Sequence, residues 1–269
     1  MNTLAKRWVT ALVAGPLVIL LIIYGSNLFF AVFIGLLVVL AVIEYGRMCL
    51  LTQTDIAVGI LSGLIIVAGA YSGKLLAGSV SAATVLAVLF FLFRNCKDRE
   101  DGSPDISILG KMILGFIAIP LLIVHLLMIR MMMPDGMKWI LLLFVIAVSG
   151  DVSAFYIGRS FGKKKLMPKV SPAKTWEGAI ASVVGSILAA LCFQSYFMPY
   201  LQIHQLVILS GSANILAQLG DLSESLIKRS AGVKDSGFLF PGHGGVLDRL
   251  DAFLLSAPFL YYYKVLVIG

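Results

Sequence analysis

Charged residues are scarce in this sequence: Asp, Glu, Lys and Arg make up only 13% of its 269 residues, whereas 59% are hydrophobic. A soluble globular protein of this length has too little interior to bury so much apolar surface. Lipid is therefore the expected solvent for most of the chain. A helix needs about 20 mainly apolar residues to cross the hydrocarbon core of a bilayer, so candidate spans can be counted directly.

Cysteine and histidine are also rare, with three of each. The cysteines at positions 49, 96 and 192 are far apart and show no Cys-x-x-Cys pairing, so they support neither a disulfide framework nor a zinc site. The apolar segments do not alternate with polar residues in the manner of membrane-barrel strands. Helices are therefore the expected membrane-spanning structure.

Nine apolar segments are candidate transmembrane helices. They cover residues 8–24, 28–43, 56–71, 79–93, 108–129, 137–157, 178–198, 203–227 and 250–268. We predict an all-α integral membrane protein with about nine transmembrane helices. The first is expected to be an uncleaved anchor, because its apolar run is long and no small-x-small cleavage site follows it.

The basic residues of the expected loops lie mostly on one side of the membrane. Seventeen Lys and Arg fall on the side of the N-terminus and four on the other. By the positive-inside rule, the N-terminus is predicted to be cytoplasmic and the C-terminus to lie opposite, in the inner (plasma) membrane of a cell. The net charge of +7 arises largely from these loop residues rather than from a nucleic-acid-binding surface. No nucleic acid is therefore expected as a partner.

Ionisable residues divide the chain into two halves. In residues 1–147 they lie in loops or at helix ends, which indicates a transmembrane scaffold. In residues 148–269, acids fall within or at the ends of the last four expected spans. A carboxylate costs about 2.5–3.5 kcal/mol at mid-membrane and is normally kept only where it faces protein or water. Residues 148–269 are therefore the expected catalytic half, with cytoplasmic loops at 159–177 and 228–249.

These acids have a helical spacing. Asp221 and Glu224 are three residues apart, with Ser225 beside them. Asp248 and Asp251 repeat that spacing, so each pair shares one face of its helix. Magnesium prefers carboxylate oxygens, usually one or two of them, completed by water and substrate phosphates. The pattern predicts a magnesium site.

Both polar loops suit phosphate groups. The loop 228–249 reads KRSAGVKDSGFLFPGHGGVLDR, in which cations accompany glycines that let backbone approach a ligand closely. We interpret His243 as a phosphate or backbone contact rather than a base. In the loop 159–177, Lys169 and Lys174 flank an expected turn at Ser171-Pro172, beside a helix whose free amides favour an anion.

Two segments of the sequence resemble motifs of a known family. Residues 225–251, SLIKRSAGVKDSGFLFPGHGGVLDRLD, resemble the signature of phosphatidate cytidylyltransferases, which runs S-x-x-K-R, K-D, H-G-G and D-R-x-D. Residues 150–178, GDVSAFYIGRSFGKKKLMPKVSPAKTWEG, resemble the family's upstream motif with its S-P-x-K-T-W-E core. The sequence departs from the family pattern beside Asp151, where Gly150 precedes it and Val152 follows.

The resemblance implies transfer of the CMP moiety of CTP to phosphatidate by magnesium-assisted in-line displacement at the cytoplasmic face. The products are CDP-diacylglycerol and pyrophosphate. The resemblance implies Asp221 and Asp248 as the main metal ligands. It implies that Asp251, Glu224 and Asp151 support them or complete a second cation site. The implied catalytic residues are Asp221, Asp248, Asp251, Lys228 and Arg249. The implied substrate-binding residues are Lys169, Ser171, Lys174, Thr175, Glu177, Ser225, Arg229, Lys234, Asp235, His243, Gly244 and Gly245.

The expected partners are CTP, phosphatidate and membrane lipids, and a homodimer is left open. The main alternative is a cation-coupled membrane transporter, because transporters also keep carboxylates within the membrane. No matched inverted halves support that alternative. A CDP-alcohol phosphotransferase would need a D-x-x-D-G-x-x-A-R pattern, which the sequence lacks. A non-catalytic lipid-binding scaffold would not need paired acids facing a glycine loop.

Overall fold

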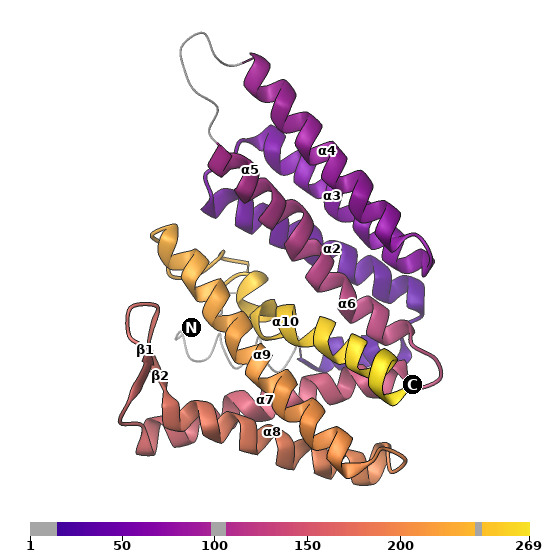
Figure 1. The fold of residues 1–269 in the computed structure, drawn as a ribbon, viewed down its shortest axis with the longest axis vertical. Helices are drawn as coiled ribbons and strands as arrows, with labels where there is room; N and C mark the ends of the chain where they lie inside the picture. Colours follow the sequence, from indigo (N-terminus) through magenta and orange to yellow (C-terminus); the bar gives the residue numbers. More distant parts are fainter. Residues whose placement is uncertain (1–14, 98–105, 240–243) are drawn as a thin grey trace. The chain divides into compact units, whose positions relative to one another are not determined.

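The computed structural model describes residues 15–97, 106–239 and 244–269, and within them the fold is almost entirely helical (Figure 1). The helical elements are α2 (Asn27–Met48), α3 (Gln53–Ser72), α4 (Leu76–Lys97), α5 (Ile106–Ile113), η1 (Leu114–Ala118), α6 (Ile119–Met131), α7 (Gly136–Phe161), α8 (Trp176–Phe197), α9 (Ile203–Ser230), α10 (Leu247–Tyr263) and η2 (Lys264–Ile268). Here η marks a short π-helical stretch.

Among the described residues, eight helices are long and apolar enough to cross a membrane. They are Asn27–Met48, Gln53–Ser72, Leu76–Arg94, Ile106–Met131, Gly136–Phe161, Trp176–Phe197, Ile203–Ser230 and Leu247–Ile268. A shorter apolar helix, Gly15–Tyr24, coincides with the end of the first expected span, whose residues 8–14 lie outside the described residues. The all-α membrane fold is confirmed, and which side each terminus faces stays a prediction.

The chain packs into two compact units. The first unit comprises the described parts of Met1–Met128 and Asp235–Leu247, and the second comprises Ile129–Lys234 and Asp248–Gly269. The boundaries of these two units differ from the predicted boundary between a scaffold half and a catalytic half at residue 147. That functional division stays a prediction.

In the first unit, α2, α3, α4 and the α5–η1 segment pack against one another (Figure 1). Glycines allow the close approach: a Cβ at Gly115 would lie 2.2 Å from the Tyr45 ring, and one at Gly59 would lie 2.3 Å from the Phe116 ring. An ion pair joins two of these helices, because Arg94 of α4 donates to the fully buried Asp55 of α3 at 2.5 Å. Aromatic rings against glycines and one closed ion pair therefore hold this unit together.

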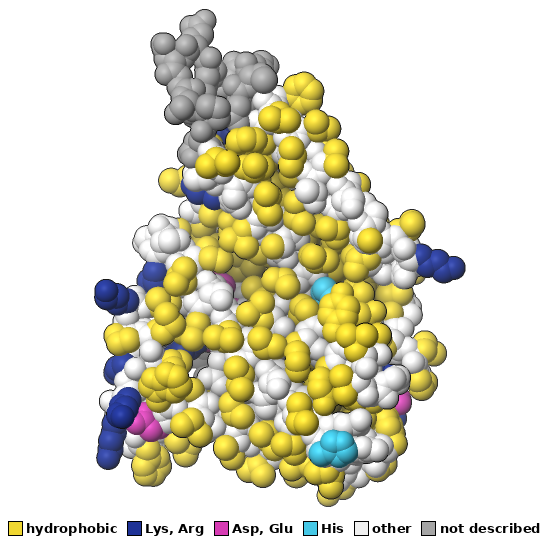
Figure 2. Space-filling view, viewed as in Figure 1, with side chains coloured by type: hydrophobic (Ala, Val, Ile, Leu, Met, Phe, Trp, Pro, Cys, Tyr) yellow, Lys and Arg dark blue, Asp and Glu magenta, His cyan; other side chains and the backbone are white. Residues whose placement is uncertain are grey.

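In the second unit, α7 packs along α8, and α9 packs against both (Figure 1). Small residues line the contact between α7 and α8, since a Cβ at Gly185 would lie 2.0 Å from Ser153 Oγ. Away from these contacts, Ile180, Val184 and Leu188 of α8 are all more than half exposed at four-residue spacing. Such a stripe on a membrane-spanning helix suits lipid. Figure 2 likewise shows a face covered mostly by hydrophobic side chains, with Lys and Arg near its edges.

A two-stranded antiparallel sheet lies between α7 and α8 in the sequence. It pairs β1 (Lys165–Met167) with β2 (Ser171–Thr175), with Lys165 opposite Thr175. The expected turn at Ser171-Pro172 is therefore wrong, because the turn lies at residues 168–170 and these two residues begin β2. Proline lacks a backbone N–H but is tolerated in an edge strand, and both strands of a two-stranded sheet are edges.

Candidate active site

A cavity of about 820 Å3 lies within the second unit and is here called the site cavity. Its volume is in the range of small-molecule pockets. It gathers predicted site residues from four elements: α7, β2, α9 and α10. They are Asp151, Lys174, Thr175, Asp221, Asp248, Arg249 and Asp251. The sequence separates these residues by up to 100 positions, and the fold brings them to one place.

A close crossing of α9 and α10 places two acidic faces together. A Cβ at Gly220 would lie 2.3 Å from the Asp251 carbonyl oxygen, so only glycine lets the helices approach this closely. Asp221 follows Gly220 directly and therefore lies near the acids of α10. At β2, Thr175 caps α8 by accepting from the Gly178 amide at 3.2 Å, which places Lys174 at the cavity wall.

Lysines pair with the acids in and beside the site cavity. Lys174 Nζ lies 2.5 Å from Asp221 Oδ2, with both side chains about a third exposed or less. Lys228 Nζ lies 2.5 Å from Asp248 Oδ1 and also pairs with Glu224, one turn earlier on α9. These last three side chains are all at least nine-tenths buried. One lysine thus serves two buried carboxylates.

Among the described residues, acidic and basic side chains line the site cavity in equal numbers. Four carboxylates line it, from Asp151, Asp221, Asp248 and Asp251, together with four cations, from Arg159, Lys165, Lys174 and Arg249. A purely acidic cavity would repel phosphates, and a purely basic one would not hold a metal ion. The mixture suits a polyphosphate bound together with a divalent cation.

The donor chemistry of the cavity fits magnesium. Within the described ranges, no group of three or more His, Cys, Asp or Glu side chains could hold a metal ion by itself. Magnesium does not require such a group, because it commonly takes one or two carboxylates plus water and substrate phosphates. Asp221 and Asp248 supply hard oxygen donors to the same cavity. An ion that arrives with nucleotide phosphates would suit this set.

Several predicted site residues lie outside the lining and make local contacts instead. Arg229 donates through Nε to the Val170 carbonyl at 3.3 Å and through Nη1 to the Val233 carbonyl at 3.1 Å, so it fastens the hairpin turn to α9. Glu177 accepts from the Lys164 amide at 3.3 Å. Ser225 donates its hydroxyl to Asp221 at 3.4 Å. These three contacts hold elements around the cavity.

The remaining predicted residues that the structure describes do not line the cavity. Lys169, Lys234 and Asp235 are exposed, and Ser171 is half-buried. Gly244 and Gly245 belong to the first unit. His243 lies outside the described residues. A phosphate contact by any of these residues stays a prediction.

A polar ladder in the second unit was not predicted from the sequence. Gln218 Nε2 donates to Asn214 Oδ1 at 2.8 Å, Asn214 Nδ2 donates to Ser186 Oγ at 2.7 Å, and Ser186 Oγ donates to the Ile146 carbonyl at 2.8 Å. Asn214 and Gln218 line the site cavity, as does Ser182. The signal was present, because Asn214, Gln218 and Asp221 repeat at helical spacing within an apolar segment.

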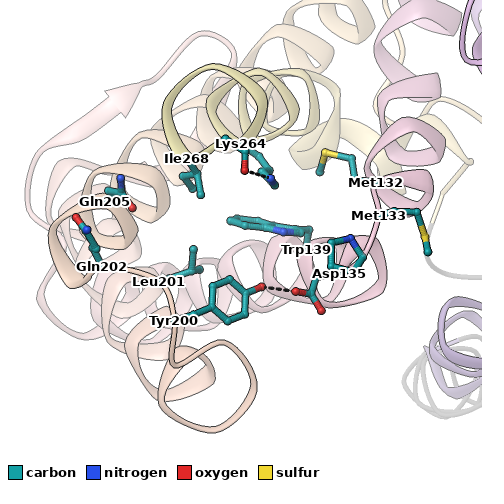
Figure 3. A pocket seen from close by; sticks show the side chains of 12 residues that line it. Met132, Met133, Asp135, Trp139, Tyr200, Leu201, Gln202, Gln205, Lys264 and Ile268 are labelled. Carbon is teal, nitrogen blue, oxygen red and sulfur yellow. Dashed lines mark hydrogen bonds between the residues drawn. The ribbon is translucent and has the colours of Figure 1, made fainter.

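A second cavity, of about 430 Å3, lies at the opposite ends of α7 and α9 (Figure 3), and its lining includes Asp135, Trp139, Tyr200 and Lys264. Asp135 points toward Tyr200, whose hydroxyl donates to it at 2.8 Å, and Lys138 pairs with it at 2.9 Å. The hydrogen bond from Lys138, and then that from Tyr200, lower the pKa of Asp135. Its charge is already compensated, and Asp135 is the one Asp or Glu among the described residues of that lining. The site cavity is therefore the better candidate.

Known proteins resemble this chain over about half of its length. The chain is similar to the phosphatidate cytidylyltransferase of Haemophilus influenzae, with 42% identity over 137 residues, or 49% of this chain and 48% of the relative. It is 42% identical to that of Bacillus subtilis over 127 residues, 47% of each chain. It is 41% identical to that of Synechocystis over 136 residues, covering 50% of this chain and 46% of the relative. The matched region spans about half the length of these relatives.

A family model gives wider coverage. The model described as the cytidylyltransferase family matches residues 5–267, which include most of both units and the described lining residues of the site cavity. Because this match runs over nearly the whole sequence, the chain belongs to the cytidylyltransferase family.

Proposed function

We propose that this protein is a phosphatidate cytidylyltransferase, which transfers the CMP moiety of CTP to phosphatidate and releases pyrophosphate. The observation that carries the proposal is the site cavity, in which four carboxylates and four cations meet among membrane-spanning helices. A lipid phosphate and a nucleotide triphosphate both need cations, and their joint binding needs a divalent ion to reduce repulsion. Family membership and the names of the relatives support the same activity.

The proposed reaction needs no general base. The phosphate of phosphatidate is already anionic at neutral pH, so one of its oxygens can attack the α-phosphorus of CTP directly. A new P–O bond forms there, the bond to the β-phosphate bridging oxygen breaks, and pyrophosphate leaves with the electron pair. Catalysis then depends on charge neutralisation and in-line positioning.

The residues of the site cavity divide these tasks. Asp221 and Asp248 would hold magnesium, which when bound supplies positive charge to the transferring phosphates. Arg159, Lys174 and Arg249 neutralise the leaving pyrophosphate and the lipid phosphate. Until substrates bind, Lys174 and Lys228 compensate the acids through the observed ion pairs. Phosphate oxygens compete for the ammonium of Lys174, which releases Asp221 as a ligand.

We further propose that the reaction takes place at the cytoplasmic face of the inner membrane. The loops 159–177 and 228–249 carry ten of the 21 basic residues, as the positive-inside rule favours for a cytoplasmic side. CTP is also supplied on that side. Two of these loop residues, Lys165 and Arg249, line the site cavity, which supports the same orientation.

The test uses the purified full-length protein in detergent micelles with phosphatidate. CTP labelled at the α-phosphorus should transfer its label to lipid, with one pyrophosphate released per labelled lipid. ATP and GTP serve as nucleotide controls, and omission of phosphatidate controls for hydrolysis. Absence of labelled lipid under all magnesium concentrations would contradict the proposal. Coupled cation uptake by protein reconstituted in vesicles would then favour the transporter alternative.

A further inference from the structure

Glu44 is a buried carboxylate within the apolar helix α2, where only 8% of the residue is exposed. Acids inside transmembrane helices are costly and are kept where they have partners. Glu44 lies in the first unit, and its hydrogen-bond partners Ser236, Val246 and Leu247 all come from one segment, Ser236–Leu247, of that same unit. Some 200 residues of sequence separate the carboxylate from this segment.

The carboxylate accepts three hydrogen bonds. The Val246 amide donates to Oε1 at 2.8 Å, and the Leu247 amide donates to Oε2 at 3.0 Å. The Ser236 hydroxyl donates to Oε2 at 3.0 Å. Ser236 begins the segment and Leu247 ends it, so one side chain holds both ends. Hydrogen bonds to an ionised acceptor are stronger than neutral ones.

Two glycines make room for this contact. A Cβ at Gly245 would lie 2.4 Å from both carboxylate oxygens of Glu44, and one at Gly237 would lie 2.6 Å from Oε1. Neither distance is sterically tolerable, so a side chain at either position would push the carboxylate away. Gly245 was predicted to approach a phosphate, and in this structure its missing side chain admits Glu44.

The two amides that Glu44 binds are at the beginning of α10, whose first residue is Leu247. The first amides of a helix have no acceptor within the helix, and a negative charge there also complements the helix dipole. The next two residues of α10, Asp248 and Arg249, both line the site cavity. These two residues directly follow Leu247 in the chain, within the same helix.

We propose that Glu44 is a positioning residue for cytidylyl transfer: it fixes the peptide groups of Val246 and Leu247 and thereby sets the place of Asp248 and Arg249. This inference rests on the proposed function. Glu44 is not among the residues that line the site cavity, so its action passes through the backbone of α10. A misplacement of reacting groups by about 1 Å can lower the rate about 100-fold.

The first test measures hydrogen exchange in the full-length protein. Glu44→Ala should speed exchange of the Val246 and Leu247 amides about tenfold, because both lose their acceptor. Glu44→Gln keeps one acceptor oxygen and should have a smaller effect. Asp55→Asn is the matched control, since it also neutralises a buried acid of the first unit but lies outside this segment. Unchanged exchange in Glu44→Ala would overturn the proposal.

The second test separates positioning from stability. Glu44→Ala should lower kcat/KM for CTP about 100-fold and raise the magnesium concentration needed for half-maximal activity, with Glu44→Gln between it and wild type. Asp55→Asn should keep the wild-type magnesium dependence even if its melting temperature falls as far. Faster exchange with unchanged magnesium dependence and kcat/KM would show a structural role only and overturn the proposal. A wild-type protein without activity would instead overturn the proposed function, while the exchange experiment would still decide whether Glu44 fixes this segment.

Discussion

The two units each bury ion pairs, but they use them differently. In the first unit, Asp55 pairs with Arg94 and also caps α3 by accepting from the Thr52 amide at 2.8 Å. That pair is closed, because each charge has one opposite charge and the acid has no exposed surface. In the second unit, Lys228 is shared between Glu224 and Asp248, and Asp248 faces a cavity. Both units therefore bury charge, and the second differs in having its shared ion pair beside a cavity.

The largest expected difference between the units concerns activity. Asp248→Asn and Asp221→Asn should each lower cytidylyl transfer about 100-fold or more, since preorganised charge at the transferring phosphates is lost without opening a cavity. Asp55→Asn, the corresponding change in the first unit, should keep most of the activity. Initial rates at saturating magnesium, normalised to folded protein, would check this. Equal rates for Asp248→Asn and wild type would break the comparison.

A smaller difference is expected in stability. Lys228→Met leaves two buried carboxylates without their cation, and Arg94→Met leaves one, so both should lower the free energy of unfolding by about 3–5 kcal/mol, with the larger effect at Lys228. Adding Glu224→Gln to Lys228→Met should recover part of the loss. Thermal unfolding in detergent measures all three variants. A Lys228→Met protein as stable as wild type would show that the shared ion pair does not form.

The polar ladder of the second unit should contribute less. Asn214→Ala removes the partner of Gln218 and of Ser186 and should cost about 1–3 kcal/mol. Ser210→Ala on the same helix is the matched control, because its hydroxyl donates to the Leu206 and Val207 carbonyls of its own helix. We expect that change to cost under about 0.5 kcal/mol. Similar melting temperatures for both variants would remove the ladder from this account.

The smallest expected effect concerns the side of the membrane that each loop faces. Cysteines introduced in turn at Lys169 and Lys234 should resist an impermeant thiol reagent on intact cells, whereas cysteines at Lys74 and Lys138 should react. The expected orientation follows from the loop charges and requires no change in activity. Labelling of the Lys234→Cys protein together with protection of the Lys138→Cys protein would reverse the predicted orientation.

Local sequence patterns predicted the helices and part of the site. The continuous apolar runs set the eight described spans to within a few residues, because a helix must satisfy its backbone in lipid over a fixed length. The three-residue spacing of Asp221 with Glu224, and of Asp248 with Asp251, correctly indicated shared helix faces. The structure then brought Asp221, Asp248 and Asp251 to one cavity.

Other features depend on contacts that local spacing does not record. The hairpin replaced an expected turn at Ser171, because pairing with β1 decides the conformation of that residue. Glu44 was not singled out from the sequence, and its partners lie some 200 residues later. The contact of Arg229 with the hairpin turn was likewise not predicted, and its role as a phosphate ligand stays a prediction. Only the folded chain shows which distant residues meet.

Direct displacement within the site cavity is the central claim, and its stereochemistry can be measured. A CTP analogue made chiral at the α-phosphorus by sulfur substitution would be converted with phosphatidate, and the configuration of the CDP-diacylglycerol product determined. A single in-line attack by the lipid phosphate predicts inversion at that phosphorus. Retention would require two displacements through a nucleotidylated residue and would contradict the account.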